Sequence, residues 1–185
     1  MLRSTITIAM LAASTTTRAA AQTVPGRDYV IRNFKFESGE TMPELRVHYI
    51  ALGAPKRDAS GVVRNAVIVN HGTTGSGGPF MNKSFGGELF GPGQLFDTSK
   101  FYVVLPDGIG HGGSSKPSDG LRAKFPKYTY NDMVDAEHRL LVDGLGVNHL
   151  RVAMGTSMGC MHAWVWGEMF PSFVDGLVPL ACAPT

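Results

Sequence analysis

A serine between two glycines is the residue of this sequence best placed to do chemistry. Gly155-Thr156-Ser157-Met158-Gly159 is a G-x-S-x-G pattern that directly follows the apolar run of residues 150–154 and precedes a segment of helical character. A serine at a sharp turn from a strand into a helix projects its hydroxyl above the sheet, and the flanking glycines keep the crowded turn free of Cβ clashes. The helix start also brings backbone N–H groups that favour a developing oxyanion. The pattern therefore predicts Ser157 as a nucleophile for acyl transfer.

A second glycine-rich segment could complete such a site. Asn70-His71-Gly72-Thr73-Thr74-Gly75 follows the apolar run of residues 66–69. Acyl transfer needs two backbone donors aimed at one oxygen. We expect the N–H of Met158, the residue after the serine, and the N–H of Thr73 to form this oxyanion hole. The alternative is an ordinary glycine-rich turn. We expect His71 to orient the loop by hydrogen bonding rather than to act as a base.

A serine nucleophile also needs a base and an acid that orients it. Only His71 and His111 lie near the expected edge of the sheet, and Asp107 is the one carboxylate that could serve either of them. Three further histidines are excluded as the base by their positions. His162 lies five residues past the serine and points around its helix, His138 is expected on an exposed helix face, and His149 starts a strand at the opposite edge.

Two other glycine-rich matches do not point to a cofactor. Gly108, Gly110 and Gly113 form a G-x-G-x-x-G match after a strand, but Pro117 breaks any helix that could present its N-terminus to a pyrophosphate. Residues 77–84 nearly form a phosphate loop, but Asn82 stands where a glycine is required. The histidines and acidic residues show no metal-ligand spacing. We therefore expect neither a cofactor nor a metal.

The elements that must position these residues alternate between strands and helices. Strands are predicted from alternating or continuous apolar runs at 29–36, 44–52, 66–69, 101–105 and 150–154, with one more within 174–182. Residues 38–40 indicate a hairpin turn between the first two strands. Thr129 and Asp132 form a capping-box pattern that begins a helix reaching Gly144, and Pro171 ends a second helix that begins near Met158.

This alternation predicts the α/β class, with a mostly parallel sheet covered by helices on both faces. Ligands of parallel sheets bind at the carboxyl ends of the strands. Three loops rich in glycine and small polar residues are expected there, at residues 70–78, 106–118 and 155–159.

The first 21 residues have the features of a signal peptide. Arg3 precedes the apolar stretch 6–13, and Ala19-Ala20-Ala21 supplies the small residues of a cleavage site. We expect export, with the mature chain beginning near Gln22; the alternative is an unstructured tail. Of 17 basic and 15 acidic residues, Arg3 and Arg18 fall in this segment, so the balance from Gln22 onward is even. This gives no electrostatic reason to bind nucleic acid, and no other apolar run suggests a membrane.

Two cysteines, Cys160 and Cys182, are too few for a disulfide framework in a domain of this size. We expect two buried thiols, and one bridge after export is the alternative.

Together these motifs resemble the α/β-hydrolase fold, and residues 125–183 resemble its homoserine O-acetyltransferase-like branch. The resemblance rests on Gly155-Thr156-Ser157-Met158-Gly159, on His71-Gly72-Thr73-Thr74-Gly75 and on a set of further matches: Phe125-Pro126, Thr129, Asp132-Met133-Val134, Leu145-Gly146-Val147, Met161 and Phe170-Pro171. It is specific at the nucleophile helix and weaker before residue 65. Cys160 stands where the biosynthetic enzymes of that branch have a second glycine.

The resemblance implies Ser157 as nucleophile, the N–H groups of Thr73 and Met158 as oxyanion hole, and a small-molecule acyl substrate. In that family the acid and the histidine follow the nucleophile by well over a hundred residues, so residues 22–185 are expected to be the N-terminal portion of a hydrolase domain, truncated after the strand that follows the nucleophile helix. An exported ester hydrolase is favoured. The alternatives are an acyltransferase, a catalytically inactive fragment or binding module, and a partner chain that supplies the rest of the triad. The oligomeric state is not indicated.

Overall fold

The computed structural model describes residues 24–183. The expected signal peptide, residues 1–21, and the expected cleavage site before Gln22 lie outside the described residues. Within residues 24–183 no helix is long and apolar enough to cross a membrane.

Within residues 24–183, six strands form one sheet, as the sequence predicted for this class. They are β1 (Arg27–Lys35), β2 (Thr41–Leu52), β3 (Ala66–Asn70), β4 (Tyr102–Pro106), β5 (Val152–Thr156) and β6 (Leu177–Leu180). The α-helices are α1 (Gly86–Leu89), α2 (Tyr130–Arg139) and α3 (Met158–Met169), with a π-helical turn at Leu140–Gly144 and short 3₁₀ turns at Gly78–Met81, Pro117–Asp119 and Arg122–Lys124. The predicted strands and helices are all present, with ends displaced by a few residues.

The order of strands in the sheet is β1-β2-β4-β3-β5-β6. β1 and β2 form the predicted antiparallel hairpin, whose turn is closed by a hydrogen bond from the Gly39 N–H to the Phe36 carbonyl at 2.9 Å. β2 is also antiparallel to β4, whereas β4, β3, β5 and β6 run parallel. The carboxyl ends of four neighbouring strands therefore meet at one edge, where the three glycine-rich loops begin.

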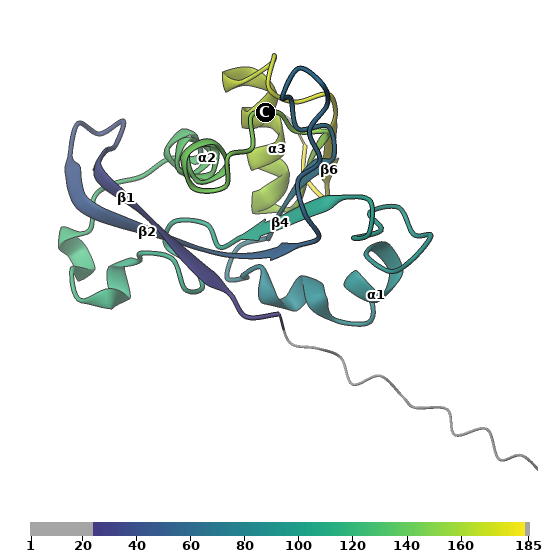
Figure 1. Cartoon of the computed structure of the whole chain (residues 1–185). Helices are drawn as coiled ribbons and strands as arrows, with labels where there is room; N and C mark the ends of the chain where they lie inside the picture. Colours follow the sequence, from purple (N-terminus) through teal and green to yellow (C-terminus); the bar gives the residue numbers. More distant parts are fainter. Residues whose placement is uncertain (1–23, 184–185) are drawn as a thin grey trace, which may run out of the picture.

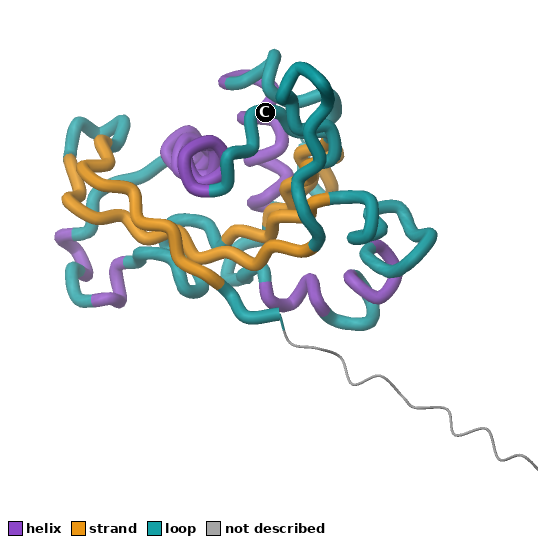
Figure 2. The backbone as a smooth tube through the Cα atoms, in the orientation of Figure 1, coloured by secondary structure: helices purple, strands orange, loops and turns teal. Residues whose placement is uncertain are grey.

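Helices cover both faces of this sheet (Figure 1). α2 and α3 lie on one face and α1 lies on the other, and the strands form one continuous twisted layer between them (Figure 2). Side chains of β3 alternate accordingly, because successive strand residues point to opposite faces. Ala66 and Ile68 belong to the apolar core beneath α2 and α3, whereas Val67 and Val69 belong to the second core on the α1 side.

Local signals in the sequence set the ends of both long helices. Thr129 and Asp132 form the predicted capping box, with each side chain bonded to the other's backbone N–H. α3 begins immediately after Ser157 and ends just before Pro171, as predicted. The capping box positions α2 over the sheet, and the residues on either side of Thr129 consequently face the carboxyl edge.

The cysteines correct one expectation, because Cys160 and Cys182 form a disulfide rather than two buried thiols. Cys160 lies in the first turn of α3, and Cys182 follows β6 by two residues. Since β6 runs parallel to β5, its carboxyl end emerges beside the start of the helix that follows β5. The two Cα atoms are 6.1 Å apart, within the usual range for a bridge.

Candidate active site

The three loops predicted at the carboxyl edge of the sheet contact one another. The Gly77 N–H donates to Asp107 Oδ1 at 2.6 Å, which joins the loop after β3 to the loop after β4. The Gly108 N–H donates to His71 Nε2 at 3.0 Å between the same two loops. Gly72 lies against Ser157, since a Cβ added to it would come within 3.4 Å of the serine Cβ. The edge is therefore one connected site rather than three separate loops.

Ser157 occupies a strained turn between β5 and α3. Its φ of 53° and ψ of −111° lie outside the regions that a residue with a Cβ prefers. Its side chain is exposed, and among the described residues it makes no capping hydrogen bond to α3. Its N–H donates to the Leu180 carbonyl of β6 at 2.9 Å, which fixes the turn from the other side. A strained, exposed serine held by its backbone is the arrangement that G-x-S-x-G predicted.

Both glycines of the pattern are required sterically. A Cβ on Gly155 would overlap the backbone of Gly159, and a Cβ on Gly159 would overlap the carbonyl of Asn70. Each obstacle is main chain rather than a movable side chain, so only glycine fits at either position. We call residues 155–159 the nucleophile elbow, after the role that the sequence pattern predicts for Ser157.

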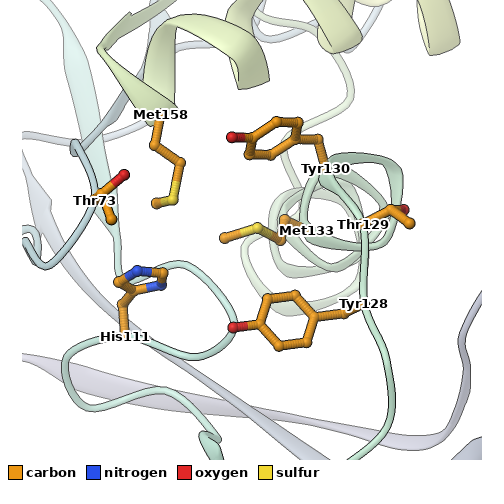
Figure 3. A pocket seen from close by; sticks show the side chains of 7 residues that line it. All are labelled: Thr73, His111, Tyr128, Thr129, Tyr130, Met133 and Met158. Atoms are coloured by element: carbon orange, nitrogen blue, oxygen red, sulfur yellow. The ribbon is translucent and has the colours of Figure 1, made fainter.

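The two residues predicted to form the oxyanion hole line the same cavity. Thr73 and Met158 border a space of about 410 Å³ whose other walls are His111, Tyr128, Thr129, Tyr130 and Met133. Figure 3 shows Thr73 and His111 on one side of it, Met158 entering from α3, and the hydroxyls of both tyrosines pointing inward. Met158 is the first residue of α3, where a backbone N–H has no intrahelical acceptor.

The loop that carries Thr73 is itself strained, because Thr74 has a φ of 63°. For a β-branched residue this is an outlier that the surrounding structure must impose. Strain on both sides of the cavity, at Thr74 and at Ser157, is typical of sites whose backbone is held for function.

His71 holds the loops together, as expected, and is not positioned as a base. It is buried, its Nδ1–H donates to the Gly72 carbonyl at 2.7 Å, and its Nε2 accepts the hydrogen bond from Gly108 described above. Both ring nitrogens are therefore engaged in the neutral form. Burial lowers the pKa of His71 below its ordinary value, which favours this neutral form further.

His111 and Asp107 do not form a catalytic pair. His111 lines the cavity, and its ring centroid lies 5.4 Å from that of His71. Asp107 is buried and accepts backbone N–H groups from Gly77 at 2.6 Å and Gly113 at 2.7 Å. Among the hydrogen bonds of residues 24–183, none joins Asp107 to either histidine. Asp107 thus anchors two loops, and the structure leaves His111 as the one described histidine facing the cavity.

Three further histidines lie elsewhere, with one correction. His149 pairs with Asp175 away from the site, and His162 pairs with Glu137 at 2.8 Å inside the protein. His138, expected on an exposed helix face, is half-buried. Its ring stacks on that of Phe170, with 4.0 Å between the two ring centroids. The correction arises because the ends of α2 and α3 pack together, and burial lowers the pKa of His138.

Sequence reasoning missed three residues near the site. Tyr128 and Tyr130 flank the cap residue Thr129, so the predicted helix start could have pointed to them as cavity walls. Glu137 lies on the apolar face of α2 between Met133 and Leu140, and a carboxylate within such a stripe is a signal of a buried polar network.

Known proteins share this fold. The family model of the alpha/beta hydrolase fold matches residues 65–183, which include all three loops of the site. The chain belongs to the α/β-hydrolase fold family. Within residues 24–183 no cluster of histidine, cysteine or acidic side chains is placed to hold a metal ion.

Relatives of this α/β hydrolase include acyltransferases and an esterase. A probable acyltransferase of Methanothermobacter thermautotrophicus is 35% identical over 85% of this chain and 48% of its own length. The homoserine O-acetyltransferase of Haloferax volcanii is 36% identical over 88% of this chain and 43% of its own. The structure of the acetyl esterase MekB is 26% identical, with a TM-score of 0.73 over 84% of this chain and 44% of that one. The chain thus spans less than half the length of these relatives.

Proposed function

We propose that this α/β hydrolase acts on an ester or related acyl bond of a small molecule through an acyl-enzyme on Ser157. The observation that carries the proposal is the exposed Ser157 at a φ of 53°, at the start of α3 and beside a cavity bordered by Thr73 and Met158. The backbone N–H groups of those two residues would stabilise the oxyanion.

The reaction has two halves. Ser157 Oγ attacks the acyl carbonyl carbon and gives up its proton; the bond from that carbon to the leaving oxygen breaks, and the leaving group departs as the protonated alcohol. The acyl group is then esterified to Ser157. Water, or an acceptor alcohol, attacks the acyl carbon in turn, and Ser157 recovers a proton as the acid or the new ester departs.

The names of the relatives and the export that we propose below bear on which acceptor is used. The relatives named as acyltransferases favour an alcohol acceptor, such as the homoserine of the Haloferax enzyme's name. Export favours water, because an exported enzyme is separated from cytosolic biosynthesis. We propose hydrolysis, with acyl transfer as the second candidate. Product analysis decides between them: incubation with an acetyl ester in the presence of homoserine yields acetate if water is the acceptor and O-acetylhomoserine if transfer dominates.

Labelling tests the nucleophile. We expect the protein expressed from its full open reading frame to react with a fluorophosphonate at Ser157, as located by peptide mass spectrometry, and Ser157→Ala to abolish the reaction. Ser60→Ala, in an exposed turn distant in sequence from the site, is the matched control and should label like the parent. Labelling of the Ser157→Ala variant at another serine would refute the assignment.

We also propose that the protein is exported and begins near Gln22 after processing. The Cys160–Cys182 disulfide supports this, because disulfides persist in oxidising compartments and are rare in the cytosol. Mass spectrometry of the protein from its native cell should find an N-terminus near Gln22 outside the cytoplasm. An intact Met1 in the cytosolic fraction would overturn the proposal and favour a biosynthetic acyltransferase.

A further inference from the structure

A buried carboxylate joins the two halves of the proposed site from behind. Glu137 of α2 is 2% exposed, and its carboxylate accepts three side-chain hydrogen bonds. His162 Nδ1 donates at 2.8 Å and Trp166 Nε1 at 2.9 Å, both from α3, and Asn70 Nδ2 donates at 3.2 Å from the end of β3. One carboxylate therefore links three separate elements.

Packing alone does not account for a carboxylate here. Burying a charged or polar group is costly unless it is fully hydrogen-bonded, and an apolar side chain of similar size would fill the same space between α2 and α3. What an apolar side chain could not do is hold Asn70. The Oδ1 of Asn70 is buried without a hydrogen-bond partner within residues 24–183, so Glu137 supplies the one hydrogen bond that orients this side chain.

Asn70 connects this network to both sides of the site. It directly precedes His71, Gly72 and Thr73, and its carbonyl lies against Gly159 of the nucleophile elbow. His162 and Trp166 lie four residues apart, on one face of α3 in successive turns. The carboxylate thus ties α3, whose first residue is Met158, to the carboxyl end of β3, from which the loop with Thr73 continues.

We propose that Glu137 is a positioning residue that holds the backbone donors of Thr73 and Met158 in register with each other. The inference rests on the proposed function, in which these two donors bind the same oxyanion. The oxyanion hole depends on it because two donors must converge on one oxygen, and misplacement by about 1 Å can cost on the order of 100-fold in rate.

Substitutions at Glu137 test this in the full-length protein. Glu137→Leu keeps the volume and removes all three hydrogen bonds. Glu137→Gln keeps an oxygen to accept from Asn70 and Trp166, and its amide can donate to His162 Nδ1 in the other tautomer. The matched control is Val134→Ala, which removes buried apolar volume from the same helix one turn away and removes none of the three hydrogen bonds.

The primary readout is hydrogen exchange of the Gly75 and Gly108 amides, whose N–H groups hold the loop of Thr73 by donating to the Gly72 carbonyl and to His71 Nε2, measured where every variant is fully folded. We expect Glu137→Leu to raise exchange there at least tenfold and to slow fluorophosphonate labelling by a similar factor. Glu137→Gln should restore both to within about threefold of the parent. Val134→Ala should lower the melting temperature yet leave both rates unchanged.

Equal exchange at Gly75 and Gly108 in Glu137→Leu and Val134→Ala would overturn the proposal and leave Glu137 a purely structural residue. If Glu137→Leu does not fold, Asn70→Ala cuts the same link from its other end and must show the same local loss of protection. The exchange readout needs no activity. Absence of labelling in the parent would therefore refute the proposed nucleophile while the exchange comparison still decided the role of Glu137.

Discussion

The nucleophile elbow and the loop after β4, residues 106–118, have similar compositions and opposite designs. Both follow parallel strands and both are rich in glycine and small polar residues. In the elbow, the polar side chain of Ser157 is exposed and its backbone is strained. In the loop after β4, Asp107 and Ser114 are buried, and Ser114 Oγ donates to the Asp107 carbonyl at 2.6 Å.

The difference shows how to separate a reactive loop from a supporting one when composition does not. A polar side chain whose hydrogen bonds are all satisfied inside the protein stabilises the fold and has no bonding capacity left for a ligand. A polar side chain that the backbone holds outward, at a cost in strain, keeps that capacity. By this criterion we propose that the elbow is the reactive loop and that the loop after β4 supports it, through Asp107 and through the hydrogen bond from Gly108 to His71.

The comparison is tested most severely by Gly159→Ala. The added Cβ would overlap the carbonyl of Asn70, so the elbow must open or the strand must shift. We expect the free energy of unfolding to fall by about 3 kcal/mol or more, at the upper end for overpacked sites, and labelling of Ser157 to be lost. Urea denaturation and fluorophosphonate labelling measure the two effects.

Gly93→Ala is the matched control for that substitution. Gly93 has a φ of 77° but open space around its Cβ position, so the change carries backbone strain of about 1 kcal/mol and no overlap. Gly159 is helical and has no positive φ, so equal losses at the two positions would show that its close contact with Asn70 costs no more than ordinary backbone strain.

Reduction of the disulfide should give the next largest effect. The bridge closes a loop across a sequence separation of 22 residues, for which the loss of unfolded-state entropy corresponds to about 3 kcal/mol. We expect a thiol reductant to lower the melting temperature of the parent, and Cys182→Ser to show the lower value with or without reductant. A parent whose melting temperature is insensitive to complete reduction would contradict this account of how the elbow is fastened.

The fold and the elbow could be predicted from sequence because their signals are local. The apolar run before Gly155, the two flanking glycines and the capping box at Thr129 each act within a few residues. The strand order, the bridge from Cys160 to Cys182 and the half-buried His138 depend on which distant segments pack together. No local pattern contains that information.

Glu137 illustrates the same limit within the site. Its three partners come from positions 25 to 67 residues away in sequence, and only the packing of α2 and α3 on β3 brings them together. Its place within an apolar helical stripe signals that it is buried, but not what it binds.

On the supporting side of the comparison, Asp107→Asn should destabilise the protein by about 2 kcal/mol. The carboxylate accepts two backbone N–H groups, and the asparagine amide nitrogen would face one of those donors and leave it unpaired. Asp143→Asn, at an exposed position, is the control and should change stability by less than about 0.5 kcal/mol. Chemical denaturation of both variants measures the difference, and equal stabilities would show that Asp107 does not anchor the loops.

The smallest effect is a pH dependence that His71 should impose on stability. Burial lowers its folded-state pKa below the ordinary 6.5, whereas the unfolded chain titrates near that value. Between the two pKa values the unfolded state therefore binds more protons, so stability falls as pH decreases through this window. One proton contributes at most about 1.4 kcal/mol per pH unit.

His71→Gln sharpens this prediction because the glutamine side chain retains an acceptor for the Gly108 N–H but does not titrate. We expect its unfolding free energy, measured in urea from pH 7.5 to 5.5, to depend less steeply on pH than that of the parent. Burial also lowers the pKa of His138, with the same sign, so part of the slope should persist until His138→Phe is added. If His71→Gln retained the full slope, His71 would not be the buried neutral link between the two loops, and its place on the supporting side of the comparison would be wrong.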